Sequence, residues 1–184
     1  WHLGEKTWFG KTTLWEESAS TTMIVRAPGA SAPGQPRRQP VSLIDVYPTV
    51  VSLLGLPAPD HATGADLATL LADPEVEPIS TALTSMNRLD HTLRTPTHRF
   101  ARFDFDSDNV ELYDEMSDPE ERVNLAYLPE YRTTRDSLNG ALHAALFGTP
   151  PVGSAPAPSD ARALSSAWPN PSRGAVSFRL ALPA

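Results

Sequence analysis

The sequence predicts a mixed α/β fold in which a small antiparallel sheet is followed by a C-terminal helix. Short runs of strand-forming residues, separated by turn residues, follow one another between residues 79 and 113. From residue 129 to 147 the apolar side chains return at helical spacing, at Leu138, Leu142, Ala145 and Leu146. Proline makes up 19 of the 184 residues, roughly twice the average share, and much of the excess follows Phe147. We therefore expect a Pro-rich linker after the helix.

Composition excludes several classes of protein. The apolar share is 40% and the charged share 20%, as in globular proteins, and no apolar run approaches the ~20 residues of a membrane helix. The formal charge of -7, from 15 basic and 22 acidic side chains, disfavours nucleic acid as a partner. Because the chain has no cysteine, disulfides, thiolate zinc sites and thiol nucleophiles are excluded within it.

The first forty residues are predicted to hold loops around one short strand. Residues 1–20 show no regular hydrophobic period and predict a loop. Residues 22–27 form an apolar, partly β-branched run, closed by Pro28-Gly29, that suits a strand of a buried sheet. Residues 30–40, which are polar and rich in Pro and Gly, predict a hairpin or loop.

A helix is predicted after Ser42, which suits its N-cap, with Gly55 as its end. Apolar residues recur there at steps of three and four, at Leu43, Val46, Tyr47, Val50, Val51 and Leu54. Pro48 lies inside this pattern, so the helix either kinks at Pro48 or begins a second segment there. A shorter helix is predicted over residues 66–72.

Four short strands are predicted in the second half, at residues 79–86, 91–94, 99–103 and 110–113. Turn residues such as Thr95-Pro96 separate them, so we expect a small antiparallel sheet. After it, Asp118 suits the cap and Pro119 the first position of a short helical turn.

The opening segment has the composition of an anion pocket. Its cations are His2, Lys6 and Lys11, and they stand among the aromatic residues Trp1, Trp8, Phe9 and Trp15. Aromatic walls exclude water and strengthen the contacts between such cations and a small anion on a sugar or aryl group. On the residues alone the plainer interpretation is favoured, in which the lysines are solvated and the Trp side chains form core.

Segments along the chain, in order, resemble the sulfatase family of the alkaline-phosphatase superfamily. Trp1-His2-Leu3-Gly4-Glu5-Lys6, Gly10-Lys11 and Leu14-Trp15-Glu16-Glu17-Ser18 are similar to the stretch that follows the Asp-His-Gly motif in iduronate-2-sulfatase-like and bacterial arylsulfatase-like enzymes. Residues 41–57 are similar to the helix that comes next, and Gly64-Ala65-Asp66-Leu67 stands at the family's Gly-x-Ser-Leu turn, with Asp66 in place of serine. Residues 93–100, 111–114 and 118–126 resemble the family's C-terminal subdomain. The resemblance spans roughly Trp1 to Phe147.

The resemblance implies the C-terminal part of an alkaline-phosphatase-like sulfatase fold over residues 1–148. Residues 1–75 would end the main α/β domain, and residues 76–148 would form the C-terminal subdomain. The implied activity is hydrolysis of a sulfate ester, on a small molecule or a glycan, with a formylglycine nucleophile and a calcium ion. Both would be supplied upstream of residue 1, so we expect no metal ligand in this chain and no activity from the chain alone.

Lys11 matches the family lysine that contacts the sulfate, which implies a catalytic and substrate-binding role. A fixed ammonium in a dry site stabilises the charge that spreads over the sulfate oxygens and the leaving oxygen in the transition state. The resemblance adds His2 and Lys6 as substrate-binding candidates. The family varies at both of these positions, so each either lines the substrate pocket or faces solvent.

Other chemically suggestive residues do not predict a site. The remaining histidines suit structural or exposed positions without metal-ligand spacing: His61, His91, His98 and His143. Three aspartates lack the Gly and distal Glu of an EF-hand and suit a solvated hairpin tip: Asp104, Asp106 and Asp108. Residues 169–173 imitate the end of the formylglycine motif, but proline occupies the nucleophile position. Glu16 and Glu17 suit either a pair with Lys11 or the cap of a turn.

The end of the chain predicts a further module. Residues 149–164 are predicted as a Pro/Ala-rich linker. Residues 165–184 resemble the start of the Ig-like C-terminal modules of secreted bacterial proteins, with a disordered tail as the alternative. Because Trp1 stands where a Met would and the last strand pattern simply stops, we expect a chain cut at both ends. The parent protein is expected to be secreted, periplasmic or at the cell surface.

Two other functions remain open. A phosphate or phosphonate monoester hydrolase of the same superfamily would share this architecture. A non-catalytic secreted module, which binds glycans or mediates attachment, would contain the same sequence segments but would not hydrolyse an ester.

Overall fold

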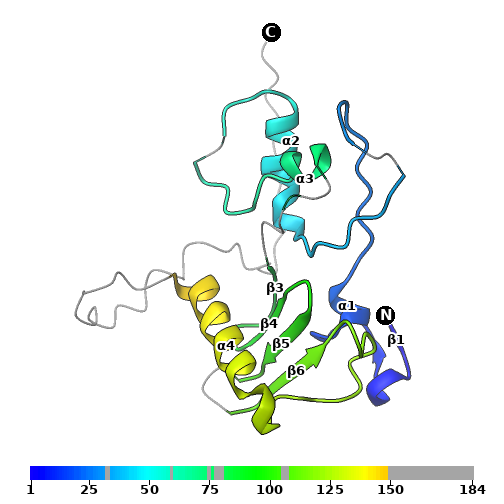
Figure 1. Ribbon diagram of the computed structural model, residues 1–184, viewed down its shortest axis with the longest axis vertical. Helices are drawn as coiled ribbons and strands as arrows, with labels where there is room; N and C mark the ends of the chain where they lie inside the picture. Colours follow the sequence, from blue (N-terminus) through cyan, green and yellow to red (C-terminus); the bar gives the residue numbers. More distant parts are fainter. Residues whose placement is uncertain (32–33, 59, 74–75, 77–80, 105–107, 149–184) are drawn as a thin grey trace, which may run out of the picture. The chain divides into compact units, whose positions relative to one another are not determined.

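The computed structural model defines residues 1–31, 34–58, 60–73, 76, 81–104 and 108–148, which belong to one compact unit. Its elements are short strands and helices (Figure 1). The predicted linker at 149–164 and the predicted module at 165–184 lie outside the described residues. Within the described ranges, no helix combines the length and the apolar character that crossing a membrane requires.

The predicted antiparallel sheet is confirmed. Its strands are β3 (Ala82–Met86), β4 (Asp90–Arg94), β5 (His98–Arg102) and β6 (Val110–Asp114). They lie in the order β3-β4-β5-β6, and each pairs antiparallel with the next. The register sets Leu93 opposite Phe100 and Phe100 opposite Leu112. Because side chains alternate across a strand, these three share one face of the sheet.

A helix covers this apolar face, as predicted. A short 3₁₀ turn, η3 (Pro129–Tyr131), leads into α4 (Arg132–Phe147), which contacts β4 and β5 and lies along the sheet (Figure 1). The buried core combines both elements: Leu93, Phe100, Val110, Leu112, Ala126 and Leu142. The predicted apolar residues Leu138 and Leu146 pack against this core. Burial of these side chains is the main contribution that stabilises the subdomain.

The chain after β6 closes the edge of that strand. Asn124 accepts a hydrogen bond from the Leu112 N–H at 3.1 Å through its side-chain oxygen and donates to the Val110 carbonyl at 3.1 Å. The Leu125 N–H donates to the Leu112 carbonyl at 2.8 Å. These contacts satisfy main-chain groups that an edge strand otherwise leaves open.

The helical turn predicted at Asp118 is wrong. Residues 118–121 form a single turn, in which the Glu121 N–H donates to the Asp118 carbonyl at 2.9 Å. The Asp118 carboxylate accepts from the Val123 N–H at 2.8 Å, across the loop rather than into a helix. Glu121 has a φ of 53°, which a right-handed helix does not accommodate.

The helix predicted after Ser42 is confirmed and begins with a 3₁₀ turn. Residues Leu43–Asp45 form η2, and Val46–Leu53 form α2. Ser42 and Asp45 make a capping box, with the Ser42 N–H donating to Asp45 Oδ2 at 2.7 Å. Pro48 lies in the first turn of α2, where a missing N–H costs little, so neither a kink nor a second helix start is needed. The shorter predicted helix is α3 (Ala68–Ala72).

The N-terminal segment, residues 1–20, is more ordered than the predicted loop. Two short strands, β1 (His2–Leu3) and β2 (Phe9–Gly10), pair antiparallel around η1 (Glu5–Thr7), and α1 (Glu16–Ala19) follows. The strand predicted at 22–27 is not assigned. Ile24 in that stretch is 88% exposed and pairs with no strand among the described residues, so its β propensity finds no sheet to join.

Candidate active-site segment

The N-terminal segment contacts the face of the sheet opposite α4. Arg99, Glu111 and Tyr113 alternate with the core residues along β5 and β6, so they point away from the core. Glu111 accepts a hydrogen bond from Trp15 Nε1 at 2.7 Å, and Arg99 Nη1 donates to the Leu14 carbonyl at 3.3 Å. Leu14 is buried at this contact. The predicted cationic segment is therefore anchored to the C-terminal sheet.

Lys6 is held at this contact. Its Nζ donates to the Tyr113 hydroxyl at 3.0 Å and to the Glu121 carbonyl. The same ammonium lies 4.3 Å from the Tyr113 ring centroid and 4.8 Å from that of Trp15, the geometry of cation–π contacts. Lys6 also lines a cleft of about 500 Å³, together with Glu5, Glu17, Glu120 and Arg122. Lys6 therefore makes structural contacts with its ammonium and also lines this cleft.

His2 is buried within the segment and does not face solvent. Its Nε2 shares a hydrogen bond with Thr13 Oγ1 at 2.9 Å, and its ring meets Trp15 edge-on at 5.6 Å between centroids. Its Nδ1 lies 4.0 Å from Glu17 Oε2, and neither atom has a hydrogen bond to the described residues. The two atoms therefore lie at the outer limit of an ion pair, close enough to interact if the imidazole carries a proton on Nδ1.

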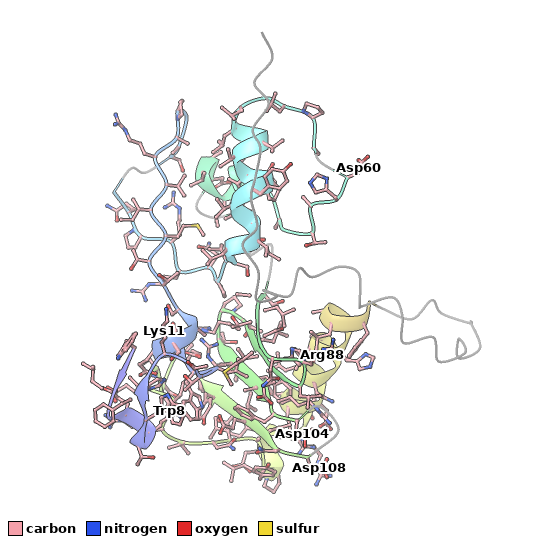
Figure 2. All side chains as sticks on the ribbon, turned by 180° about the vertical axis from the view of Figure 1, so that it is seen from behind. Trp8, Lys11, Asp60, Arg88, Asp104 and Asp108 are labelled. Carbon is pink, nitrogen blue, oxygen red and sulfur yellow. The ribbon has the colours of Figure 1, made fainter. Side chains whose placement is uncertain are left out.

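Lys11 has a different environment from the other two cations. It is exposed, directly after β2, and its side chain forms no hydrogen bond or ion pair within the described ranges (Figure 2). The β1–β2 register sets His2 opposite Gly10, the residue before Lys11. The three predicted site residues thus lie on one segment in three different environments, and of the three only Lys11 presents an ammonium without a partner among the described residues.

A buried charge cluster, which sequence reasoning did not predict, lies under the segment. Arg99 pairs with the carboxylates of Glu16 and Glu121, and its Nε lies 3.4 Å from Glu115 Oε1. Arg94 Nε lies 3.3 Å from the same Glu115 oxygen. The sequence feature that could have indicated this cluster is the presence of Arg94 and Arg99 within predicted strands. A charged residue flanked by core residues in a strand needs a buried partner of opposite charge.

Burial is the largest influence on the pKa values of Glu115 and Glu121 in this cluster. It raises the pKa of Glu115 to about 7, against the opposing attraction of Arg94 and with a further increase from the Glu121 charge. Burial also raises the pKa of Glu121, and the Arg99 guanidinium opposes that change. In β6, burial raises the pKa of Tyr113, and the Glu111 carboxylate raises it further. The Tyr113 hydroxyl therefore stays neutral beside Lys6.

The cluster does not fit a calcium ion. Carboxylate oxygens of Glu16, Glu115 and Glu121 lie within 4.8 Å of one another, as in a metal site. The guanidinium of Arg99 pairs with all three carboxylates. A cation there would meet the positive charge of Arg99 and would have to displace it.

The remaining chemically suggestive residues take structural or exposed positions. His91 is buried and bonded to Ser85 Oγ at 2.8 Å, whereas His61 and His143 are exposed. Asp104 and Asp108 are exposed in the connection between β5 and β6, and Asp106 lies outside the described residues. Glu16, in the first turn of α1, pairs with Arg94 and Arg99 instead of Lys11 and makes no side-chain capping hydrogen bond, so neither alternative proposed for it is found among the described residues.

A comparison with known families decides the assignment. The family described as N-sulphoglucosamine sulphohydrolase, C-terminal, matches residues 4–146. The chain belongs to this sulfatase family. The match covers the N-terminal segment from Gly4 onward, the helices α2 and α3, the sheet and nearly all of α4.

Curated sulfatases are similar over most of this chain. A sulfatase of Formosa agariphila is 26% identical over 142 residues, which are 77% of this chain and 27% of the relative. The N-acetylglucosamine-6-O-sulfatase of Bacteroides thetaiotaomicron is 28% identical over 148 residues, which are 74% of this chain and 26% of that enzyme. The chain thus spans about a quarter of the length of these relatives.

Solved structures share this fold. A phosphonate monoester hydrolase of Silicibacter pomeroyi superimposes with a TM-score of 0.59 at 22% identity, over 74% of this chain and 31% of that one. A 2-O GAG sulfatase superimposes with a TM-score of 0.53 at 23% identity, over 65% and 28%. The sulfatase chain therefore has the predicted fold, a mixed α/β arrangement of the alkaline-phosphatase-like class.

Proposed function

We propose that this chain forms one wall of the active site of a sulfatase that hydrolyses sulfate esters of glycans. The observation that carries the proposal is the exposed ammonium of Lys11 on a segment that the sheet anchors on both sides. Membership of the sulfatase family supports the reaction class. The similarity to an N-acetylglucosamine-6-O-sulfatase supports a sulfated sugar as the substrate class.

The proposed role of Lys11 is electrostatic. In sulfate ester hydrolysis, negative charge spreads over the sulfate oxygens and the departing ester oxygen. A fixed ammonium close to those oxygens stabilises the transition state more than the ground state when water is excluded. Lys11 has no carboxylate partner within the described residues, so its charge is available for a sulfate.

His2 and Lys6 are proposed to serve the same site in a secondary way. Lys6 lines the cleft beside Glu5 and Arg122, where it can meet a polar group of the substrate. His2 is buried and hydrogen-bonded to Thr13, so its contribution to substrate binding would come through the shape of the segment.

The nucleophile and the metal are proposed to come from other parts of the polypeptide. When present, formylglycine would supply the nucleophile and a calcium ion would supply positive charge beside the sulfate. The acidic triad found in this chain already pairs with Arg99 and does not fit that ion. We accordingly expect the chain by itself to be inactive.

A phosphate or phosphonate monoester hydrolase is the second candidate, which the superposition with the Silicibacter pomeroyi enzyme favours. The test uses the complete polypeptide that contains this chain, with an aryl sulfate, an aryl phosphate and an aryl phosphonate monoester compared under one condition. We expect kcat/KM to be highest for the sulfate. A preference for either phosphorus ester would replace the sulfatase proposal with the second candidate.

A glycan-binding or attachment module without catalysis is the remaining alternative, and it predicts no turnover of any of these esters. The resemblance of residues 165–184 to secreted modules supports a location outside the cytoplasm. Fractionation of the producing cells tests this location, and recovery of the protein with the cytoplasmic fraction would contradict it.

A further inference from the structure

Lys11 lies on a stretch of chain that the sheet holds on both sides. Before Lys11 in the sequence, Lys6 donates to the Tyr113 hydroxyl at 3.0 Å and to the Glu121 carbonyl. After it, the Leu14 carbonyl accepts from Arg99 Nη1 at 3.3 Å.

The Glu16 N–H donates to Glu121 Oε2 at 2.9 Å, and the Glu16 carboxylate pairs with Arg99. Glu121 therefore touches the segment on both sides of Lys11, once through its carbonyl and once through its carboxylate. Arg99 and Glu121 also pair with each other. Both are almost completely buried.

At these contacts the backbone adopts an unfavourable conformation, which the surrounding contacts must stabilise. Lys6, Thr7 and Glu121 have φ values of 50°, 59° and 53°, in the left-handed region that residues with a Cβ rarely adopt. Such conformations persist where the surroundings over-determine them. The two strained positions Lys6 and Glu121 contact each other directly, so the path of the segment depends on the loop after β6.

We propose that Arg99 and Glu121 are positioning residues for Lys11, which hold the N-terminal segment so that the Lys11 ammonium stays at the reacting ester. This inference rests on the proposed function of Lys11. Arg99 suits the task because its planar guanidinium presents several donors at fixed angles, and here it reaches one carbonyl and three carboxylates. A lysine at this position would keep the charge but not the fork of donors.

A displacement of the segment by about 1 Å would move Lys11 relative to the ester and can reduce the rate about 100-fold. Substrate binding through other parts of the site would change less. The expected result of disturbing the segment is therefore a fall in kcat with a smaller change in KM. This fall in kcat should not occur in a protein that already lacks the Lys11 side chain.

The test is a double-mutant cycle in the complete polypeptide with an aryl sulfate as substrate. Arg99→Lys is expected to lower kcat by about 10- to 100-fold in the presence of Lys11 and to have little further effect in the Lys11→Ala background. Glu16→Gln provides a second variant, since Glu16 is only partly buried and its loss leaves the core intact. Equal effects in both backgrounds, or no effect, would overturn the inference.

The matched control is Arg102→Lys. Arg102 lies on the same strand but on the α4 side, where its Nη1 donates to Asn139 at 3.0 Å. This variant is expected to keep kcat within about 2-fold, because its contact does not reach the N-terminal segment. A loss of kcat as large as that of Arg99→Lys would show that any disturbance of β5 suffices and would overturn the specific role of Arg99.

Amide hydrogen exchange separates this inference from the proposed function. Arg99→Lys and Glu16→Gln are each expected to raise the exchange of residues 2–16 about 10-fold, while exchange in β4 and α4 stays unchanged. This result would show that Arg99 and Glu16 hold the segment even if Lys11→Ala keeps full activity, an outcome that would defeat the proposed role of Lys11 and with it the catalytic purpose of the positioning. Unchanged exchange at residues 2–16 would overturn the positioning role regardless of activity.

Discussion

Gly64 lies against the main chain of Ile44 so closely that a Cβ built on Gly64 would be 2.2 Å from the Ile44 carbonyl oxygen. Two hydrogen bonds hold the chain in this place. The Ala65 N–H donates to Asp45 Oδ1 at 2.7 Å, and the Leu67 N–H donates to Thr49 Oγ1 at 2.9 Å. The turn that resembles the sulfatase Gly-x-Ser-Leu motif is therefore fastened to the start of α2.

Gly64→Ala is expected to lower the free energy of unfolding by about 2–4 kcal/mol, because backbone atoms of Ile44 and Asp45 cannot move away as a flexible side chain would. Chemical denaturation of the variant and the parent measures the difference. Gly140→Ala in α4 is the matched control, since nothing lies within 4 Å of the added Cβ and alanine favours a helix by up to about 1 kcal/mol. Equal stabilities of the two variants would contradict this account of Gly64.

Glu115 is expected to make the protein less stable as the pH rises from about 4.5 to about 7. Its pKa is raised from 4.5 to about 7 by burial, so in this window the folded state retains a proton that the unfolded state releases. The folded state binds more protons, and the free energy of unfolding falls with rising pH, by an amount on the order of 2 kcal/mol. Above pH 7 this contribution becomes constant.

Glu115→Gln tests this sign. Denaturation at pH 5 and at pH 7.5 should show that the substitution stabilises the protein more at the higher pH, where Glu115 is otherwise ionised. Glu120→Gln serves as control, because its exposed side chain pairs with the exposed Arg122 and with no other described residue, so it should give the same small effect at both pH values. A Glu115→Gln variant that loses more stability at pH 7.5 than at pH 5 would reverse the assignment.

Lys6 and Lys11 are expected to differ in their effect on stability. Lys6→Met removes a cation from between two aromatic rings and leaves the Glu121 carbonyl without a donor, at a cost of about 1–3 kcal/mol. Lys11→Met removes an exposed side chain without a partner among the described residues and should change stability by less than about 0.5 kcal/mol. Thermal unfolding compares the two, and a larger loss for Lys11→Met would contradict their placement.

The sheet and its covering helix were predictable because local patterns determine them. Strands β3 to β6 alternate with turn residues, and α4 repeats apolar residues at helical spacing. The stretch at 22–27 was predicted wrongly because β propensity requires a pairing strand, and none of the described strands pairs with it. The helical turn at Asp118 was also predicted wrongly. Asp118 and Pro119 suit a helix start, but Glu121 has a positive φ and contacts Lys6 and Arg99, which no local pattern shows.

The cations of the N-terminal segment were predictable as residues, but their separate environments were not. Resemblance to the sulfatase family selected Lys11, and the sequence left both pocket and solvent open for His2 and Lys6. Tyr113, a partner of Lys6, lies about a hundred positions away in the sequence, so only the folded chain shows this contact. The charge cluster around Arg99 was missed for the same reason, since Glu16 lies in α1 whereas Glu115 and Glu121 lie about a hundred positions further on, in the loop after β6.

Lys11→Ala in the complete polypeptide is expected to lower kcat for an aryl sulfate by about 100-fold or more, because one fixed cation is lost from the transition state. Thermal stability should stay nearly unchanged, since Lys11 is exposed and has no partner within the described ranges. Arg88→Ala is the matched control: it removes one exposed cation from the turn between β3 and β4, away from the N-terminal segment (Figure 2), and should keep full activity. If Lys11→Ala and Arg88→Ala retained the same activity, Lys11 would not contact the reacting ester, and the segment would be a structural part of the sulfatase fold.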